Sequence, residues 1–475
     1  MAAQTEKSRV SRPPEPIGLA TTGQLRDPGW AWAVYEPDAR RPWNLALAAH
    51  LYRRAAFGAN WQQLQQALAE GPQRTVDRLL QPQADVNAFN RTYDDYENVG
   101  ARSINGLRAW WLRRMMETPH PLLEKMTLFW HSHFATNAAE VKNPRLMQEH
   151  IQLLRHHALG EFRPFLHAIS RDPAMLVWLG ADVNRKGAPN ENFVRPLMET
   201  FTLGPGEFTE RDVREAARAF TGWLVLRGRL RYIPREHDET AKNILGREGK
   251  FAADDVVRIV LEQRATARMV VRKLYRWLIS ETEEPSEAFI APLADSFASD
   301  YSVSRLVETM LRSNAFFSQL AYRQRTKCPV EFAVGIAQAL EGIVSTTHLA
   351  QDVADLGQDL CHPPTVKGWP GGRCWIDAAT LVRRSNLSLS LLRDEEPYGD
   401  KLNPRAVAQK YGYAEPESTA RFLLDLFLQG DLQADVREAM LQDVRTAAAD
   451  RDSDPGIALR SFAQTVTSLP EFHLA

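Results

Sequence analysis

The chain has 475 residues, more than the roughly 250–300 that one hydrophobic core usually serves, so two packed lobes and one large helical array are both open. Hydrophobic residues make up 44% and charged residues 25%, a globular balance that excludes disorder as the general state. Lys and Arg number 58 against 59 Asp and Glu, so no net field draws the chain to nucleic acid or to an anionic membrane.

Residues 1–42 are expected to form a partly disordered N-terminal arm, because prolines and charges are mixed there without a helical period. The first residues lack the apolar run of a secretion signal, and the run at 174–179 is far shorter than the roughly 20 residues that span a bilayer. The three cysteines include no CxxC pair and give no disulfide framework. We therefore expect a cytoplasmic protein without a membrane span.

From Trp43 onward, apolar residues recur at spacings of three and four, the period of a helix with one buried face. The clearest helix begins at Thr209, which forms a capping-box pattern with Asp212, and ends by Gly222. Similar faces recur at 252–262, 264–280, 302–312, 328–343, 377–392, 415–428, 433–446 and 455–469. The sequence therefore predicts an all-α fold, a large irregular helical array without a fixed repeat.

Two segments interrupt the helical pattern. Residues 357–372 are rich in Pro and Gly and are expected to form an irregular loop. This loop divides a main helical domain at 43–356, which carries the candidate site, from a C-terminal helical segment within 357–475. The alternating arginines at 227–231 are typical of an exposed strand or turn rather than of a phosphate groove.

His131 and His133 are the first candidate metal ligands, because neutral imidazole is the commonest protein ligand for zinc-like ions. Residues two apart on a helix are separated by about 200°, so both could face one ion only if the helix ended near Trp130. The alternative is that His133 is a hydrogen-bonded core residue and His131 is partly exposed.

The second candidate group follows Pro189, where a helix is expected to begin with Glu191 in its first turn. Glu191, Arg195 and Glu199 lie four apart on one stripe. The stripe is either a chain of ion pairs worth about 0.2–0.5 kcal/mol each or part of a site. Pro196 within it should kink the helix or restart it.

The third candidate pair is His237 with Asp238, in a segment with little apolar periodicity. Such a pair serves as metal ligands or as a base with its orienting group, and it also occurs by chance in exposed loops. If the three groups share one cleft, they could bind a divalent metal ion with one ligand from each group. These ligands would be either His131 or His133, either His237 or Asp238, and either Glu191 or Glu199. The expected metal ligands are His131, His133 and His237, the catalytic groups Glu191, Glu199 and Asp238, and the substrate-binding residues Asn190, Asn192, Arg195 and Trp223.

Several blocks of the chain together resemble the bacterial domain of unknown function 1800 family. The blocks lie at 51–58, 124–134, 189–193, 201–204, 219–223, 363–370 and 469–472. The resemblance covers about 45–475 and, by the family's own description, implies no settled activity. Many relatives carry an export leader, which this chain lacks, and where they have a Glu this chain has Pro196. If that Glu is catalytic in relatives, the chemistry here is altered.

Two functions of different classes remain. The first is a metal-assisted or acid–base enzyme, hydrolytic or group-transferring, acting on an unknown small molecule. The second is a non-catalytic helical binding or scaffold protein whose polar groups lock elements together. The family resemblance suggests a sulfatase- or phosphatase-like partner for the scaffold, since relatives are often encoded beside such proteins.

Overall fold

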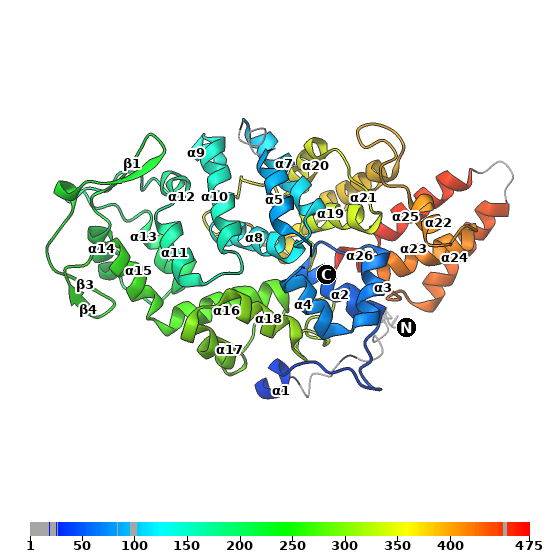
Figure 1. The fold of residues 1–475 in the computed structure, drawn as a ribbon, viewed down its shortest axis with the longest axis horizontal. Coiled ribbons are helices and arrows are strands. Elements are labelled where there is room, and N and C mark those ends of the chain that lie inside the picture. The colour runs from blue at the N-terminus through cyan, green and yellow to red at the C-terminus, as the bar shows by residue number, and fades with distance from the viewer. Residues whose placement is uncertain (1–18, 20–24, 26, 83, 96–101, 450–453) are drawn as a thin grey trace, which may run out of the picture.

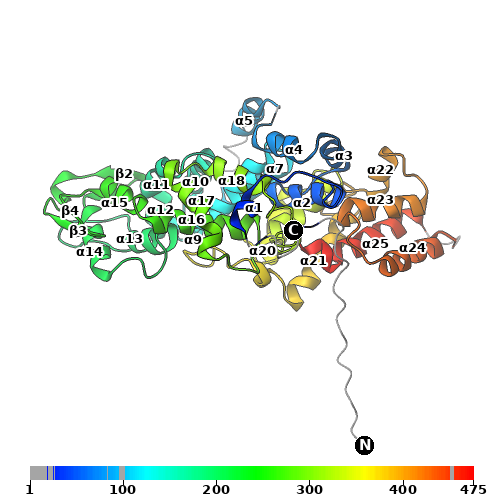
Figure 2. The ribbon, with the colours of Figure 1, turned by 90° about the horizontal axis from the view of Figure 1, so that it is seen from below.

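The computed structural model describes residues 19, 25, 27–82, 84–95, 102–449 and 454–475. Within these ranges the chain is a long array of helices, which Figure 1 and Figure 2 show as an elongated body in two perpendicular views. The predicted all-α class is confirmed, because strands occur there only in two short hairpins and in isolated bridges.

The first half of the array consists of α1 (Pro28–Trp32), α2 (Leu45–Ala55), α3 (Trp61–Glu70), α4 (Pro72–Leu80), α5 (Val86–Asp95), α7 (Ile104–Glu117), α8 (Pro121–His133), α9 (Ala138–Val141), α10 (Pro144–His157), α11 (Phe162–Ser170), α12 (Pro173–Trp178), α13 (Val194–Pro196), the π-helical turn η2 (Leu197–Thr202) and α14 (Glu210–Ala219). The second half consists of the 3₁₀ turn η3 (Pro234–Glu236), α15 (Ala253–Leu261), α16 (Arg264–Leu278), α17 (Glu287–Asp300), α18 (Val303–Arg312), α19 (Pro329–Ala339), α20 (Thr346–Asp355), the 3₁₀ turn η4 (Gly372–Trp375), α21 (Ala378–Leu392), α22 (Pro404–Lys410), α23 (Pro416–Leu428), α24 (Ala434–Ala449), α25 (Pro455–Ser468) and α26 (Pro470–His473).

The helix begun by Thr209 forms as the sequence predicts. The Thr209 hydroxyl accepts from the Asp212 amide at 3.2 Å, and the Asp212 carboxylate accepts from the Thr209 amide at 2.8 Å. This capping box satisfies two amides that have no partner within the helix. Helix α14 ends at Ala219, and Gly222 follows with φ +90°, a conformation that suits glycine.

The arginine-rich segment at 227–231 is extended, in agreement with its sequence pattern. Strand β1 (Trp223–Leu226) pairs antiparallel with β2 (Arg229–Tyr232), and the turn between them is at residues 227 and 228. A second hairpin joins β3 (Lys242–Ile244) to β4 (Arg247–Gly249). Both hairpins lie at one end of the elongated body, opposite the end that carries α24 (Figure 1).

The described part of the predicted N-terminal arm packs on the array. The Trp32 indole donates to the Phe289 carbonyl at 2.7 Å, and Tyr35 is fully buried. The other arm residues, 1–18, 20–24 and 26, lie outside the described residues. The buried apolar side chains form one continuous cluster from Leu25 to Phe472, so the whole described chain shares a core.

The predicted irregular loop at 357–372 is confirmed, and it lies directly on the C-terminal end of α8. Gly368 has φ +75°, and a Cβ at this position would lie 2.1 Å from the Ser132 carbonyl oxygen. The close approach therefore depends on glycine, and it fixes the loop over α8. Across the described ranges, no helix has the length and apolar character needed to cross a membrane.

Candidate functional site

His131 is fully buried, so the alternative in which it is partly exposed is wrong. Its Nε2 accepts from the Cys361 amide at 3.1 Å, and its ring lies 5.1 Å from Trp111 and 5.4 Å from Trp369. The loop at 357–372 supplies two of these contacts, and its cover could not be predicted from the helix alone. Burial, followed by the nearby imidazoles, lowers the pKa of His131 to about 3, so the ring is neutral.

His133 points away from His131, because α8 stays helical through both residues instead of ending near Trp130. The His133 Nδ1 accepts from the Lys273 ammonium at 2.9 Å, and its ring packs against Phe134 at 4.4 Å. Burial, followed by the Lys273 charge, holds the pKa of His133 well below its usual range. His133 is therefore a neutral hydrogen-bond acceptor.

The third predicted metal ligand, His237, lies at the hairpin end of the molecule. Its Nδ1 is 2.8 Å from the Thr221 carbonyl oxygen, so this ring nitrogen already has a hydrogen-bond partner. In the part of the chain that the structure describes, no three His, Cys, Asp or Glu side chains gather as a metal site. The described donors do not fit the expected ligand set, so no chemical step is assigned to a metal and the divalent ion stays a prediction.

The segment after Pro189 is not helical until Val194, so the expected helix start before Glu191 is wrong. The Asn190 amide group donates to the Gly180 carbonyl at 2.7 Å, and its side-chain oxygen accepts from the Asn192 amide at 2.9 Å. These bonds hold the two predicted substrate-binding asparagines in a turn. Helix α13 ends at Pro196 and continues without a break into the π-helical turn η2.

The predicted stripe of Glu191, Arg195 and Glu199 does not form one chain of ion pairs. Arg195 pairs with Glu191 at 3.1 Å and with Glu210 at 2.7 Å. Glu199 instead pairs with Lys367 of the loop, at 3.1 Å. The stripe therefore forms ion pairs, and it also brings Glu199 toward the loop at 357–372.

Asp238 is held by charged and hydroxyl donors at the hairpin end. Arg218 donates to it at 2.8 Å, and the amide of Thr240 donates at 2.9 Å. Burial raises the pKa of Asp238, but these bonds outweigh burial and keep the pKa below its usual range. Asp238 is therefore a permanently charged partner of Arg218. Trp223, the remaining predicted substrate-binding residue, packs against Phe220 at 5.3 Å.

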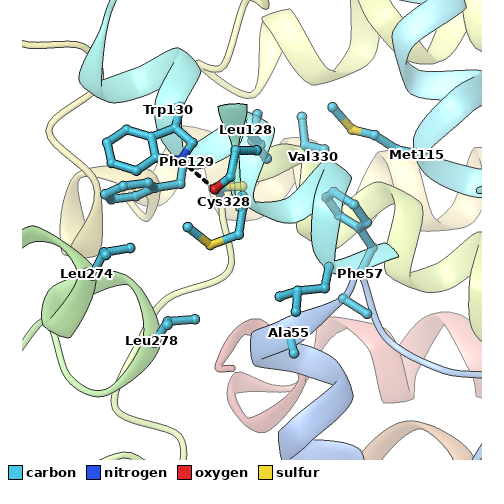
Figure 3. Close-up of a cluster of buried hydrophobic side chains, with 14 of the residues drawn as sticks. Ala55, Phe57, Met115, Leu128, Phe129, Trp130, Leu274, Leu278, Cys328 and Val330 are labelled. Carbon is cyan, nitrogen blue, oxygen red and sulfur yellow. Dashed lines mark hydrogen bonds between the residues drawn. The ribbon is translucent and has the colours of Figure 1, made fainter. Parts of the chain in front are cut away.

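Helices α8 and α16 and the loop at 357–372 enclose a polar cavity that includes His133, which we call the Lys273 pocket. It contains about 980 Å³ of free space, open solvent at its mouth included. Figure 3 shows the apolar packing beside it, where Phe129 of α8, Leu274 and Leu278 of α16 and Cys328 belong to one cluster of buried side chains. Of the predicted residues, His133 lines this pocket and Glu199 contacts its rim through Lys367.

The charges of the Lys273 pocket are strongly unbalanced. Four cations line it, against the single carboxylate of Glu281; they are Lys273, Arg276, Arg325 and Lys367. Arg325 is paired with buried Glu331, Arg276 with exposed Glu284, and Lys367 with half-buried Glu199. The lining of the pocket therefore has more cationic side chains than carboxylates, which gives it a positive potential.

Lys273 has the most altered acid–base behaviour among these cations. Its Nζ donates to His133 Nδ1 at 2.9 Å and to the Thr200 carbonyl at 2.9 Å. Burial, followed by the charges of Arg276 and Lys367, lowers the pKa of Lys273 to about 7. Lys273 therefore exchanges a proton near neutral pH, which an exposed lysine does not do.

The walls of the pocket are aromatic. Phe129, Trp277, Trp369 and Trp375 line it and offer flat apolar surfaces. Burial raises the pKa of the Cys328 thiol to about 12, so this thiol is not ionised at neutral pH.

Sequence reasoning missed Lys273 and the aromatic wall. Lys273 lies within the predicted helix at 264–280, where one lysine in a segment that also has four arginines gives little signal. Its partner His133 is 140 residues earlier in the chain. The block at 363–370 did carry a signal, because its glycine, tryptophan and proline interrupt an otherwise helical chain.

A second groove borders the Lys273 pocket and shares Glu281 and Arg325 with it. A third hollow contains Glu191 and Arg195 beside Trp178 and Val366. Since Val366 and Lys367 are neighbours, this hollow lies across the loop from the Lys273 pocket. The predicted glutamates therefore lie on two sides of one loop rather than in one cleft.

Comparison with known proteins gives one match. Residues 50–474, nearly the whole chain, match the family described as "Protein of unknown function (DUF1800)". No curated protein and no solved structure matches the chain.

Proposed function

We propose that this chain, which belongs to the DUF1800 family of proteins of unknown function, is an acid–base enzyme acting on a small anionic molecule in the Lys273 pocket. The observation that carries the proposal is a lysine with a pKa of about 7, hydrogen-bonded to a neutral histidine inside a cation-rich cavity. A base is most effective when its pKa is near the working pH, which is where Lys273 titrates.

The pocket supports binding of an anion with a flat apolar part. Arg276 and Lys367 are free to turn from their partners toward a ligand, since surface ion pairs of this kind are weak. Trp277 and Trp369 provide faces on which a ring can stack. Together these groups favour a molecule that carries a carboxylate or phosphate beside an aromatic or sugar ring.

The chemistry follows from the hydrogen bonds of Lys273. Its neutral amine takes a proton from an attacking water or hydroxyl, the oxygen bonds to the electrophilic atom of the substrate, and the bond between that atom and the leaving group breaks. The ammonium so formed has three N–H groups, two of which His133 and the Thr200 carbonyl accept. The third N–H returns the proton to the leaving group. Such proton transfer contributes about 10²–10⁴-fold to a rate.

The binding step is tested by calorimetric titration of the full chain with phenyl phosphate and benzoate, and with neutral benzyl alcohol as the uncharged match. We expect the two anions to bind and Lys273→Met to weaken binding at least tenfold at pH 6.5, because it removes a charge from the pocket. The control Lys250→Met changes an exposed lysine and should bind as the wild type does. Equal binding by wild type and Lys273→Met, or no binding of either anion, contradicts the proposal.

A scaffold function is a second candidate, favoured by a separate observation. Glu199 and Asp238 each pair with a cation from another segment, as expected of groups that lock elements together. A sulfatase- or phosphatase-like protein is the partner that the family resemblance suggests. Co-purification with such a protein, together with unchanged assembly in Lys273→Met, would favour this function. A chain that stays monomeric and turns over a small anion would exclude it.

A further inference from the structure

A second cation-rich cavity lies under α2, separate from the Lys273 pocket, and we call it the Arg53 cavity. It is lined by Arg53 of α2 and by Lys327, just before α19, with the ring of Phe472 and the side chain of Gln429. Both cations are buried, with 6% of each residue exposed. Arg53 belongs to the sequence block at 51–58, whose polar residues the proposed function does not use.

The Arg53 guanidinium is only partly satisfied. One nitrogen, Nη1, donates to the Gln429 side chain, while Nε and Nη2 are buried without a hydrogen-bond partner in the described part of the chain. Burial, followed by the charge of Arg323, lowers the pKa of Arg53 to about 10, so the group stays charged at neutral pH. Two donors of a buried cation are therefore available.

Lys327 also lacks a counter-ion. Its Nζ lies 3.6 Å from the centroid of the Phe472 ring, and it forms no ion pair with a described residue. The carboxylate that lines the cavity, Glu331, already pairs with Lys125 and Arg325 and accepts from the Cys328 amide at 2.8 Å. Two cations thus share a cavity whose carboxylate is taken by other groups.

We infer that the Arg53 cavity binds a small anion between the Arg53 guanidinium and the Lys327 ammonium. A buried charge without a partner is costly, and a counter-ion from solution removes that cost where the protein supplies none. Burial, followed by the charges of Arg53 and Arg323, holds the pKa of Lys327 well below its usual range, and a bound anion would act against this shift.

The size of the cavity limits the anion. The volume of the cavity is about 30 Å³. One water molecule needs roughly 10–15 Å³, so the cavity holds about two or three water-sized atoms. The close approach of Gly58 to Gly335, where a Cβ on Gly58 would be 3.5 Å from the Gly335 Cα, keeps the cavity narrow. A halide or a single carboxylate group fits, and a larger organic phosphate does not.

The inference is tested by thermal unfolding of the full chain in chloride, formate or gluconate at one ionic strength and at pH 7. Chloride or formate should raise Tm with the logarithm of its concentration, while gluconate, which is too large, should not. Response to formate alone identifies a carboxylate site, and response to chloride identifies a halide site. Equal melting in all three salts would overturn the inference.

Variants locate the site. Arg53→Met and Lys327→Met should lose the chloride or formate response, whereas Arg108→Met should keep it. Arg108 is a matched control, since it is a buried arginine whose Nε lacks a hydrogen-bond partner among the described residues but it does not line the cavity. If either variant fails to fold, crystals of the wild type grown in bromide decide the question. An anomalous peak between Arg53 and Lys327 supports the inference, and its absence there contradicts it.

Discussion

The Lys273 pocket and the hairpin end of the molecule both gather polar side chains, but only in the pocket do cations outnumber the carboxylates that line the same space. At the hairpin end, Arg218 pairs with Glu215 at 2.7 Å and with Asp238 at 2.8 Å. In the pocket, four cations face one carboxylate. The types of residue are therefore similar in the candidate site and in the ion pairs that hold the hairpin end together. What differs is the ratio of cations to carboxylates. The predictions below test this difference, from the largest expected effect to the smallest.

The largest effect should come from the loop that covers the pocket. Gly368→Ala places a Cβ 2.1 Å from the Ser132 carbonyl, so the loop must move off α8. We expect a loss of about 3 kcal/mol or more in the free energy of unfolding, measured with urea, and weaker binding of phenyl phosphate. Gly371→Ala is the control, because its φ of +71° gives a similar backbone strain with no atom within 4 Å. Equal losses in the two variants would show that the contact with Ser132 does not hold the loop.

The next effect is a pH dependence confined to the pocket. The pKa of Lys273 is lowered from 10.5 to about 7, so its charge is present below pH 7 and is lost as pH rises. Affinity for phenyl phosphate should therefore fall about tenfold from pH 6.5 to pH 8.5, where one charge contact is removed. Calorimetry measures this. In Lys273→Met the affinity should not change over that range; a similar fall there would assign the titration to another group.

The lowered pKa of Lys273 should make the free energy of unfolding rise with pH, whereas it makes the affinity for phenyl phosphate fall. Because the folded pKa of Lys273 lies below the unfolded value, the unfolded chain binds more protons between about pH 7 and pH 10.5. Through Lys273, the free energy of unfolding should rise with pH in this window, and the slope should be smaller in Lys273→Met. Urea titrations at pH 7 and pH 9 compare the two slopes. Identical slopes would mean that Lys273 titrates normally.

At the hairpin end, where the charges are paired, Asp238→Asn should lower the free energy of unfolding by a smaller amount. It removes the partner of Arg218, at a cost of about 1 kcal/mol for a partly exposed pair. Since the folded pKa of Asp238 is lowered, this contribution is present above about pH 4 and is lost on acidification. Urea unfolding at pH 7 and pH 3 should show the difference from wild type shrinking. Phenyl phosphate binding should be unchanged, and a loss of binding would place Asp238 in the site.

The smallest effect is expected for the ion pairs of Glu191, Arg195 and Glu199. Glu191→Gln breaks an ion pair with Arg195, but Arg195 keeps Glu210 at 2.7 Å. We expect a loss of about 0.5 kcal/mol or less in the free energy of unfolding, reduced further by salt. A loss of ligand binding in this variant would restore Glu191 as a site residue.

The sequence predicted the fold where local pattern decides it. The capping box of Thr209 and Asp212 and the proline-rich loop at 357–372 depend on neighbours in the chain, and both formed as expected. The helix start before Glu191 was wrong, because the Asn190 side chain bonds to the Gly180 carbonyl and holds a turn. That bond competes with the helix, and sequence spacing does not show it.

The sequence predicted less of the site, because the site depends on contacts between distant segments. His133 was predicted as either a metal ligand or a hydrogen-bonded core residue, and the structure shows its Nδ1 hydrogen-bonded to Lys273, a partner that the sequence did not indicate. The lowered pKa of Lys273 comes from burial and from two cations, one of them in the loop. These effects arise only after tertiary packing, so no local motif reports them.

The proton affinity of Lys273 tests the central claim most directly. Competitive labelling of the folded protein with trace acetic anhydride, followed by mass spectrometry of each lysine peptide, gives the pKa of individual amines. We predict that Lys273 titrates near pH 7, far below the roughly 10.4 of a lysine in a model peptide. A Lys273 that titrates at the model-peptide value would contradict the proposed acid–base function.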